Sequence, residues 1–185
     1  SVKDAWHKGE YKQVSNAVEA NLPDGTKQTV FNTTDPVLQT QDAMMRLIEW
    51  YNNDEETLPL IKAALFVYEF LSIHPFQDGN GRLSRLLTSL LLLKNGYSWI
   101  QYVSFEHEIE NRKSEYYKVL MDAQKNRPGE NVTTWLMFFT SCLNNIQGKL
   151  MLKLEESKKA SETLAAREQR ISFYIQNHAG CSTGD

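Results

Sequence analysis

The sequence predicts an all-α helical bundle with a small β-hairpin near its N-terminus. Apolar residues recur at helical spacing or form runs of helical length in five stretches, which cover residues 37–51, 59–73, 82–94, 105–124 and 132–154. One strong turn signal precedes them, at residues 22–25. The 185 residues, 41% of them apolar, suffice for one domain with a substantial core.

The hairpin is predicted from the turn and its flanks. Leu22-Pro23-Asp24-Gly25 has turn composition, and the segment after it is rich in Thr, Val and Phe, which favour strands. We expect strands at roughly Lys12–Ala20 and Lys27–Asn32. An ordered loop is the alternative at this stage.

The first two helices carry start signals. Asp35-Pro36 begins the amphipathic stretch Val37–Tyr51, with proline expected in the first turn. Thr57 is expected to cap the apolar helix that runs from Pro59 to Ile73.

The later helices are predicted from the residues that begin or end them. The run Arg82–Lys94 holds seven leucines, and Asn95-Gly96 should terminate it. Residues 97–104 fit a strand or a connector. Ser104 is expected to cap one helix over Phe105–Gln124, and a break at 127–129 precedes the last bundle helix, Val132–Leu154.

The most informative segment joins the two most apolar helices and holds a potential anion site. Gly79, Asn80 and Gly81 precede a helix, whose N–H groups and dipole favour a bound phosphate. Arg82 and Arg85 are three residues apart on that helix, so both can reach phosphate oxygens.

Asp78 and His74 add a metal ligand and a base. A carboxylate at Asp78 would repel phosphate unless a bound Mg²⁺ removed the conflict. His74 can accept a proton near neutral pH. The segment therefore indicates phosphoryl or nucleotidyl transfer.

Simpler interpretations apply to each piece alone. Gly79-Asn80-Gly81 is no dinucleotide fingerprint, since Ser84 stands where the third glycine belongs, and no P-loop sequence follows. His74 and Asp78 could be two zinc ligands, but further ligands at useful spacing are missing from the sequence. The two arginines could be solvated helix charges.

The segment resembles the signature of the Fic (filamentation induced by cAMP) family, His-x-Phe-x-Asp/Glu-Gly-Asn-Gly-Arg-x-x-Arg, and matches it at all eight fixed positions. The resemblance implies an all-helical Fic fold and a protein adenylyltransferase, which transfers AMP from ATP to a Ser, Thr or Tyr hydroxyl of a target protein. Relatives with altered signatures transfer phosphate or phosphocholine, so the unaltered signature favours AMP. Which nucleotide base the site prefers stays open.

The resemblance also implies residue roles. His74 would deprotonate the attacking hydroxyl, and Asp78 would hold Mg²⁺ against the α- and β-phosphates. The anion hole would be lined by Gly79, Asn80 and Gly81, and the β- and γ-phosphates would be held by Arg82 and Arg85. Phe76 would anchor the loop.

Outside the signature, the resemblance implies two weaker assignments. The pair Tyr116-Tyr117 stands where the family's tyrosines lie near the adenine, although both could be core aromatics. Gln124 stands where some relatives carry an asparagine that contacts the base, so that contact is in doubt.

The family also implies partners. The hairpin, about residues 12–32, would be a flap that pairs with an extended segment of the target protein. Family members are often inhibited by a helix bearing Ser/Thr-x-x-x-Glu-Gly/Asn, whose glutamate pairs with the second signature arginine, here Arg85. Glu110-Asn111 and Glu130-Asn131 have the right ending but lack the Ser or Thr. We therefore expect the inhibitory helix to lie outside the chain segment of residues 1–185 or on a separate protein.

The predicted organisation is a Fic domain at 1–154 and an extension at 155–185. Residues 155–162 fit a helical extension or linker. Residues 164–185 resemble the opening of a truncated winged-helix domain, which would bind DNA through a missing part; a C-terminal helix packed on the core is the alternative. A nucleotide-sensing regulator is therefore the alternative function, although a sensor needs no base at His74.

Composition limits the remaining options. The net charge of −3 gives no overall attraction to nucleic acid or anionic membranes. Cys142 and Cys181 form neither a metal pattern nor a disulfide framework, so a reducing cytoplasm fits best. No apolar run is long enough to span a membrane. The sequence leaves a homodimer open.

Overall fold

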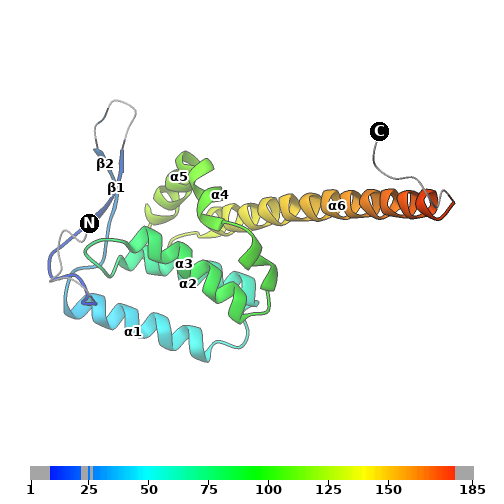
Figure 1. Cartoon of the computed structure of the whole chain (residues 1–185). Helices are drawn as coiled ribbons and strands as arrows, with labels where there is room; N and C mark the ends of the chain where they lie inside the picture. Colours follow the sequence, from blue (N-terminus) through cyan, green and yellow to red (C-terminus); the bar gives the residue numbers. More distant parts are fainter. Residues whose placement is uncertain (1–8, 22–24, 26, 178–185) are drawn as a thin grey trace. The chain divides into compact units, whose positions relative to one another are not determined.

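The computed structural model of the chain describes residues 9–21, 25 and 27–177. Within these ranges, six α-helices follow a two-stranded hairpin (Figure 1). In chain order the elements are β1 (Ala17–Asn21), β2 (Lys27–Asn32), α1 (Leu38–Asn53), α2 (Pro59–Ile73), α3 (Asn80–Lys94), the 3₁₀ helix η2 (Ser98–Tyr102), α4 (Phe105–Asn111), α5 (Lys113–Gln124) and α6 (Thr133–Asn177).

The strands β1 and β2 pair antiparallel, with an irregularity between Val18 and Glu19. β1 begins at Ala17 rather than at Lys12. The reason is that the Lys12 backbone N–H donates to the carbonyl of Pro75 and not to a neighbouring strand. Most of the predicted turn, residues 22–24, lies outside the described residues.

Two helix starts differ from the prediction. Pro36 lies in a turn before α1, and the Thr40 hydroxyl donates to the Asp35 carbonyl at 2.6 Å. Thr57 does not cap α2: the N-cap is Leu58, while the Thr57 N–H donates to Asp54 Oδ1. Proline stands in the first turn of α2, as expected.

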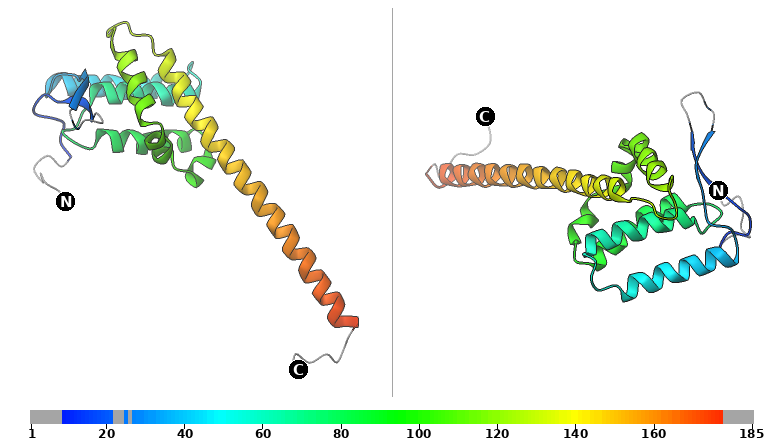
Figure 2. Two further views of the ribbon diagram at one scale, coloured as in Figure 1. Left: turned by 90° about the horizontal axis from the view of Figure 1, so that it is seen from above. Right: turned by 180° about the vertical axis from the view of Figure 1, so that it is seen from behind.

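The core forms around α2, whose buried side chains include Ala63, Phe70 and Ile73. α2 and α3 are antiparallel neighbours, joined by the loop that carries the signature (Figures 1 and 2). The first turns of α6 complete this core, because Trp135 is fully buried and its indole N–H donates to the Ala64 carbonyl at 2.8 Å.

The predicted helix over 105–124 is two helices. Arg112 takes a non-helical conformation between α4 and α5, and its guanidinium bonds Glu115 and Ser141 while lying over the ring of Phe138. These contacts stabilise Arg112 in its non-helical conformation between the two helices. The prediction for Ser104 is confirmed, since its side chain accepts the His107 N–H.

The chain divides into two compact units, residues 1–146 and 147–185. In the second unit, α6 continues without interruption through residues 155–162 to Asn177. This stretch is therefore helical. Residues 178–185 lie outside the described part, so the winged-helix resemblance stays a prediction. No described helix is both long and apolar enough to cross a membrane.

Candidate functional site

The loop between α2 and α3 lies at the end of these helices nearest the hairpin (Figure 2). His74 ends α2 in the left-handed region, with φ 52°, and its backbone N–H donates to the Phe70 carbonyl at 2.9 Å. Non-glycine residues rarely adopt this conformation, which costs about 1–2 kcal/mol. The fold therefore holds His74 in a defined, unfavourable backbone geometry.

The environment of His74 keeps its ring neutral. Burial lowers the pKa of His74 to about 4, and the positive charge of Lys12 acts in the same direction. The Leu71 carbonyl, 3.4 Å from Nδ1, and the carboxylate of Asp78 act in the opposite direction. At neutral pH the imidazole consequently carries a lone pair that can accept a proton.

Asn80 closes the loop through its side chain. Its Oδ1 accepts the Phe76 N–H at 2.9 Å and its Nδ2 donates to the Phe76 carbonyl at 2.6 Å, while only 1% of Asn80 is exposed. The sequence places Asn80 at an anion hole but gives no sign of this role. This one amide therefore bonds both the N–H and the carbonyl of Phe76, and the same carbonyl also accepts from the Asn16 amide.

The start of α3 has the geometry of an anion site. Gly79 caps the helix in the left-handed region at φ 83°, and the helix begins at Asn80. The first N–H groups of a helix have no intrahelical partner and can bind an anion. A Cβ at Gly81 would lie 3.4 Å from Nη1 of Arg85, so this arginine reaches back towards the same turn.

Asp78 and Arg82 lie beside this turn and are exposed by 94% and 73%. Asp78 Oδ1 accepts the Gly79 N–H at 2.6 Å, and Oδ2 is 3.5 Å from Arg82. In the described part of the chain, no three His, Cys, Asp or Glu side chains gather to hold a metal. A single exposed carboxylate does fit Mg²⁺ that is bound mainly by phosphate oxygens and water.

Arg85 makes a contact that the sequence analysis missed. Its Nε and Nη2 donate to Oε1 of Glu106 on α4, at 3.2 and 2.8 Å. The Arg85 side chain is 23% exposed and that of Glu106 is 64% exposed. For the rejected candidate Glu110-Asn111, Glu106 is the residue that stands where the inhibitory motif needs Ser or Thr. The pairing of Glu106 with Arg85 comes from the packing of α4 on α3, which no sequence spacing displays.

The residues predicted near the nucleotide base differ in how deeply they are buried. Tyr116 is 7% exposed, and its ring packs against Trp135 and Phe138. Burial raises the pKa of Tyr116 well above its ordinary value. Tyr117 is half-buried and meets Tyr116 edge-on. Gln124 is nearly buried and its amide donates to the Ser72 hydroxyl, so the amide is already engaged within the core.

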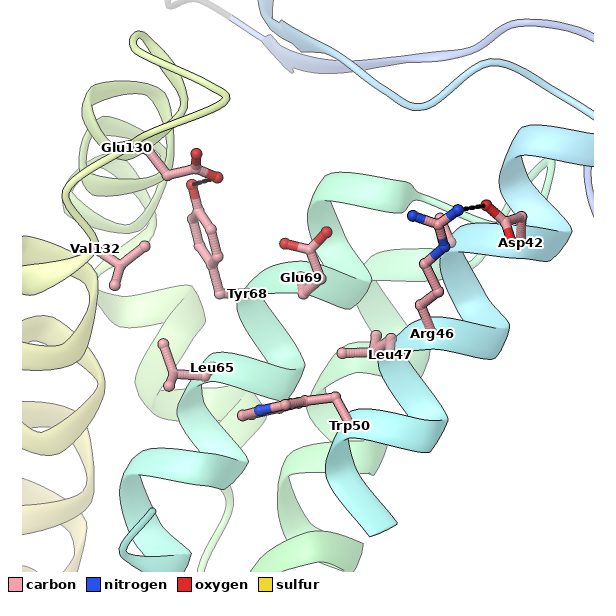
Figure 3. A pocket seen from close by; sticks show the side chains of 10 residues that line it. Asp42, Arg46, Leu47, Trp50, Leu65, Tyr68, Glu69, Glu130 and Val132 are labelled. Carbon is pink, nitrogen blue, oxygen red and sulfur yellow. Dashed lines mark hydrogen bonds and ion pairs between the residues drawn. The ribbon is translucent and has the colours of Figure 1, made fainter. Parts of the chain in front are cut away.

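A cavity of about 550 Å³ lies apart from the signature residues. Its walls come from α1, α2 and the segment before α6, and they include Trp50 and Tyr68 (Figure 3). The carboxylates that line this cavity already have partners within the protein. Asp42 pairs with Arg46, and Glu69 pairs with Arg127. Glu130 pairs with Arg127 and also accepts from the Tyr68 hydroxyl. None of the signature residues lines it.

Known proteins are similar to this chain in sequence. The family model described as "Fic/DOC family" matches residues 2–92. A protein adenylyltransferase Fic of Drosophila mojavensis is 33% identical over 54% of this chain and 18% of its own length. Protein adenylyltransferase fic-1 of Caenorhabditis elegans is 43% identical over 28% and 10%. A Fido domain-containing protein of Dictyostelium discoideum is 31% identical over 53% and 64%.

Two solved structures are similar. A Fic family protein of Desulfovibrio desulfuricans superposes with a TM-score of 0.65 at 27% identity, over 78% of this chain and 41% of that one. A Fic domain-containing signaling protein of Bacteroides thetaiotaomicron gives 0.55 at 29% identity, over 77% and 54%. The matched segment thus spans only a tenth to two thirds of the length of these relatives.

Proposed function

Because this chain belongs to the Fic/DOC family, we propose that it transfers AMP from ATP to a Ser, Thr or Tyr hydroxyl of a target protein. The names of the Drosophila and Caenorhabditis relatives, protein adenylyltransferases, support this proposal. So does the complete signature of residues 74–85. The observation that supports it most is the neutral imidazole of His74, in the loop that leads into the N-terminus of α3. The first turns of α3 carry Arg82 and Arg85.

In the proposed reaction, His74 accepts the proton of the attacking hydroxyl. The hydroxyl oxygen forms a bond to the α-phosphorus of ATP, the bond between the α-phosphorus and the bridging oxygen breaks, and pyrophosphate leaves with that electron pair. The neutral state of His74 suits this role, since an imidazolium has no lone pair to accept the proton.

The start of α3 and the two arginines stabilise negative charge on the phosphates. The free N–H groups of the first turn donate to phosphate oxygens, and Arg82 and Arg85 supply positive charge. Asp78 would hold Mg²⁺, which neutralises phosphate charge when bound. The exposure of Asp78 and Arg82 leaves both accessible to a nucleotide.

We also propose that the hairpin receives the target. An extended segment of the target would add to the edge of β1 or β2 through backbone hydrogen bonds, as in other strand-addition complexes. The proposal is tested by incubating the protein with ATP, Mg²⁺ and candidate target proteins, followed by peptide mapping. AMP linked to a hydroxyl side chain supports it. Transferred phosphate without AMP argues for a phosphotransferase instead.

Replacing Arg82 with Ala should weaken nucleotide binding. Loss of one charged hydrogen-bonding group costs about 1.5 to 3 kcal/mol, or roughly 10- to 150-fold in Kd. Isothermal titration with ATP and Mg²⁺ measures the change. Arg46→Ala is the control, because Arg46 is an equally exposed arginine that pairs with Asp42 on α1. Equal binding by both variants would argue against a phosphate contact at Arg82.

Replacing Glu106 with Gln should tighten nucleotide binding. The carboxylate of Glu106 occupies Nε and Nη2 of Arg85, and an incoming phosphate must displace it. An exposed ion pair is worth up to about 1 kcal/mol, so we expect roughly two- to fivefold tighter binding. Glu110→Gln on the same helix, whose carboxylate pairs with Lys113, is the control. Weaker binding by Glu106→Gln would instead mean that Glu106 aligns Arg85 for the nucleotide.

A further inference from the structure

Lys12 is a lysine buried directly against the catalytic loop. It is 1% exposed, whereas lysine is almost never fully buried unless it is paired. Its Nζ donates to Asn16 Oδ1 at 3.0 Å, to Thr33 Oγ1 at 2.8 Å and to the Ile73 carbonyl at 2.9 Å. An ammonium has three N–H donors, and here each has an acceptor. This is a fully satisfied, built site for a positive charge.

The acceptors join the two ends of the hairpin. Asn16 immediately precedes β1, and Thr33 immediately follows β2. The Thr33 hydroxyl also lies 2.8 Å from the Asn16 carbonyl and 2.5 Å from its Oδ1. Lys12 therefore holds both ends of the hairpin in one polar cluster, Lys12-Asn16-Thr33.

The same cluster holds the backbone on both sides of His74. Besides the bond from Nζ to the Ile73 carbonyl, the Lys12 N–H donates to the Pro75 carbonyl at 2.8 Å. The Asn16 side-chain amide donates to the Phe76 carbonyl at 2.9 Å. Carbonyls before and after the left-handed residue are thus fixed by groups from the base of the hairpin. Such contacts can offset the conformational cost at His74.

We infer that Lys12 is a positioning residue for His74: its ammonium, with Asn16 and Thr33, fixes the His74 backbone relative to the hairpin. The role of His74 as the base rests on the proposed function. The consequence is that a target strand bound to the hairpin is placed in register with the group that takes its proton. A shift of about 1 Å in such a group can cost about a hundredfold in rate.

The charges around His74 agree with this role. Burial is the main reason that the pKa of His74 is lowered to about 4, and Lys12 contributes in the same direction. Asp78, from the signature loop, opposes it. For Lys12, burial lowers the pKa to about 8 while Asp35, from the segment before α1, raises it. Lys12 thus remains charged at neutral pH.

The inference is tested by replacing Lys12 with Met and titrating His74 by NMR, with its signal identified by comparison with His74→Asn. Removal of the charge should raise the pKa of His74, because the positive charge of Lys12 disfavours the protonated imidazole. Lys12→Arg should restore most of the original value, because it keeps the charge and donors. Lys62→Met is the control for general destabilisation, since Lys62 is a bonded lysine on α2 whose Nζ donates to the Asp54 carbonyl.

Activity gives the second readout. Lys12→Met should lower kcat about ten- to a hundredfold with little change in the Kd for ATP. If Lys12→Met does not fold, Thr33→Val removes one arm of the cluster and should lower kcat in the same way, without loss of the charge. An unchanged pKa of His74 in folded Lys12→Met, or an equal shift in Lys62→Met, overturns the inference. Because the titration needs no substrate, it stands or fails independently of AMP transfer.

Discussion

Replacing His74 with Ala or Asn should lower the proposed AMP transfer by about 10²- to 10⁴-fold, since a positioned general base contributes this much. Nucleotide binding should stay within a few-fold of the wild type, because the proposed phosphate site consists of the start of α3 and the two arginines and does not include His74. Asn is the sharper variant: it tolerates the left-handed backbone of His74 but cannot act as a base. Initial rates and ATP titrations measure the two quantities separately.

His107→Ala is the matched control. His107 is exposed on α4, where its backbone N–H donates to the Ser104 hydroxyl. It should transfer AMP at the wild-type rate. If His74→Asn retained more than a tenth of the wild-type kcat, another group would be the base and the assignment would be wrong.

Replacing Asn80 with Ala should remove both stability and activity. The Phe76 N–H would lose its acceptor, and the Phe76 carbonyl would keep only the Asn16 amide, which costs about 1 to 3 kcal/mol in the free energy of unfolding. The loop would also lose the bonds that keep His74 and α3 in register. We expect transfer to fall about a hundredfold or more even in the folded protein.

Asn95→Ala separates these two effects. Asn95 lies at the other end of α3, where its amide donates to the Leu91 carbonyl and to the hydroxyl of Tyr51. Its loss should lower the free energy of unfolding but leave the transfer rate unchanged. Chemical denaturation and rate measurements on both variants make the comparison. Equal rates for Asn80→Ala and the wild type would show that the Phe76 contacts do not position the site.

The sequence predicted the parts of the site that are local. Gly79 and Gly81, the two arginines and the leucine run predict a loop followed by a helix from Arg82, and in the structure α3 begins two residues earlier, at Asn80. The end of this helix at Asn95-Gly96 was predicted for the same reason. Local patterns of this kind depend on neighbours within a few residues, which the sequence displays.

Other features depend on packing between distant segments. Lys12 reaches the Ile73 carbonyl across 61 positions, and Glu106 reaches Arg85 across 21. Neither contact has a spacing rule. The break at Arg112 likewise depends on Ser141 and Phe138 of α6. A charged residue shows no sign of burial in the sequence. The only signal for Lys12 was its position at the uncertain start of a predicted strand.

The most direct measurement of the central claim uses ATP labelled at the α-phosphate and, separately, at the γ-phosphate. Each is incubated with Mg²⁺, candidate target proteins and either the wild type or His74→Asn. The account predicts label on protein from the α-phosphate only, with wild-type protein only. Label from the γ-phosphate, or α-label that persists in His74→Asn, would contradict it.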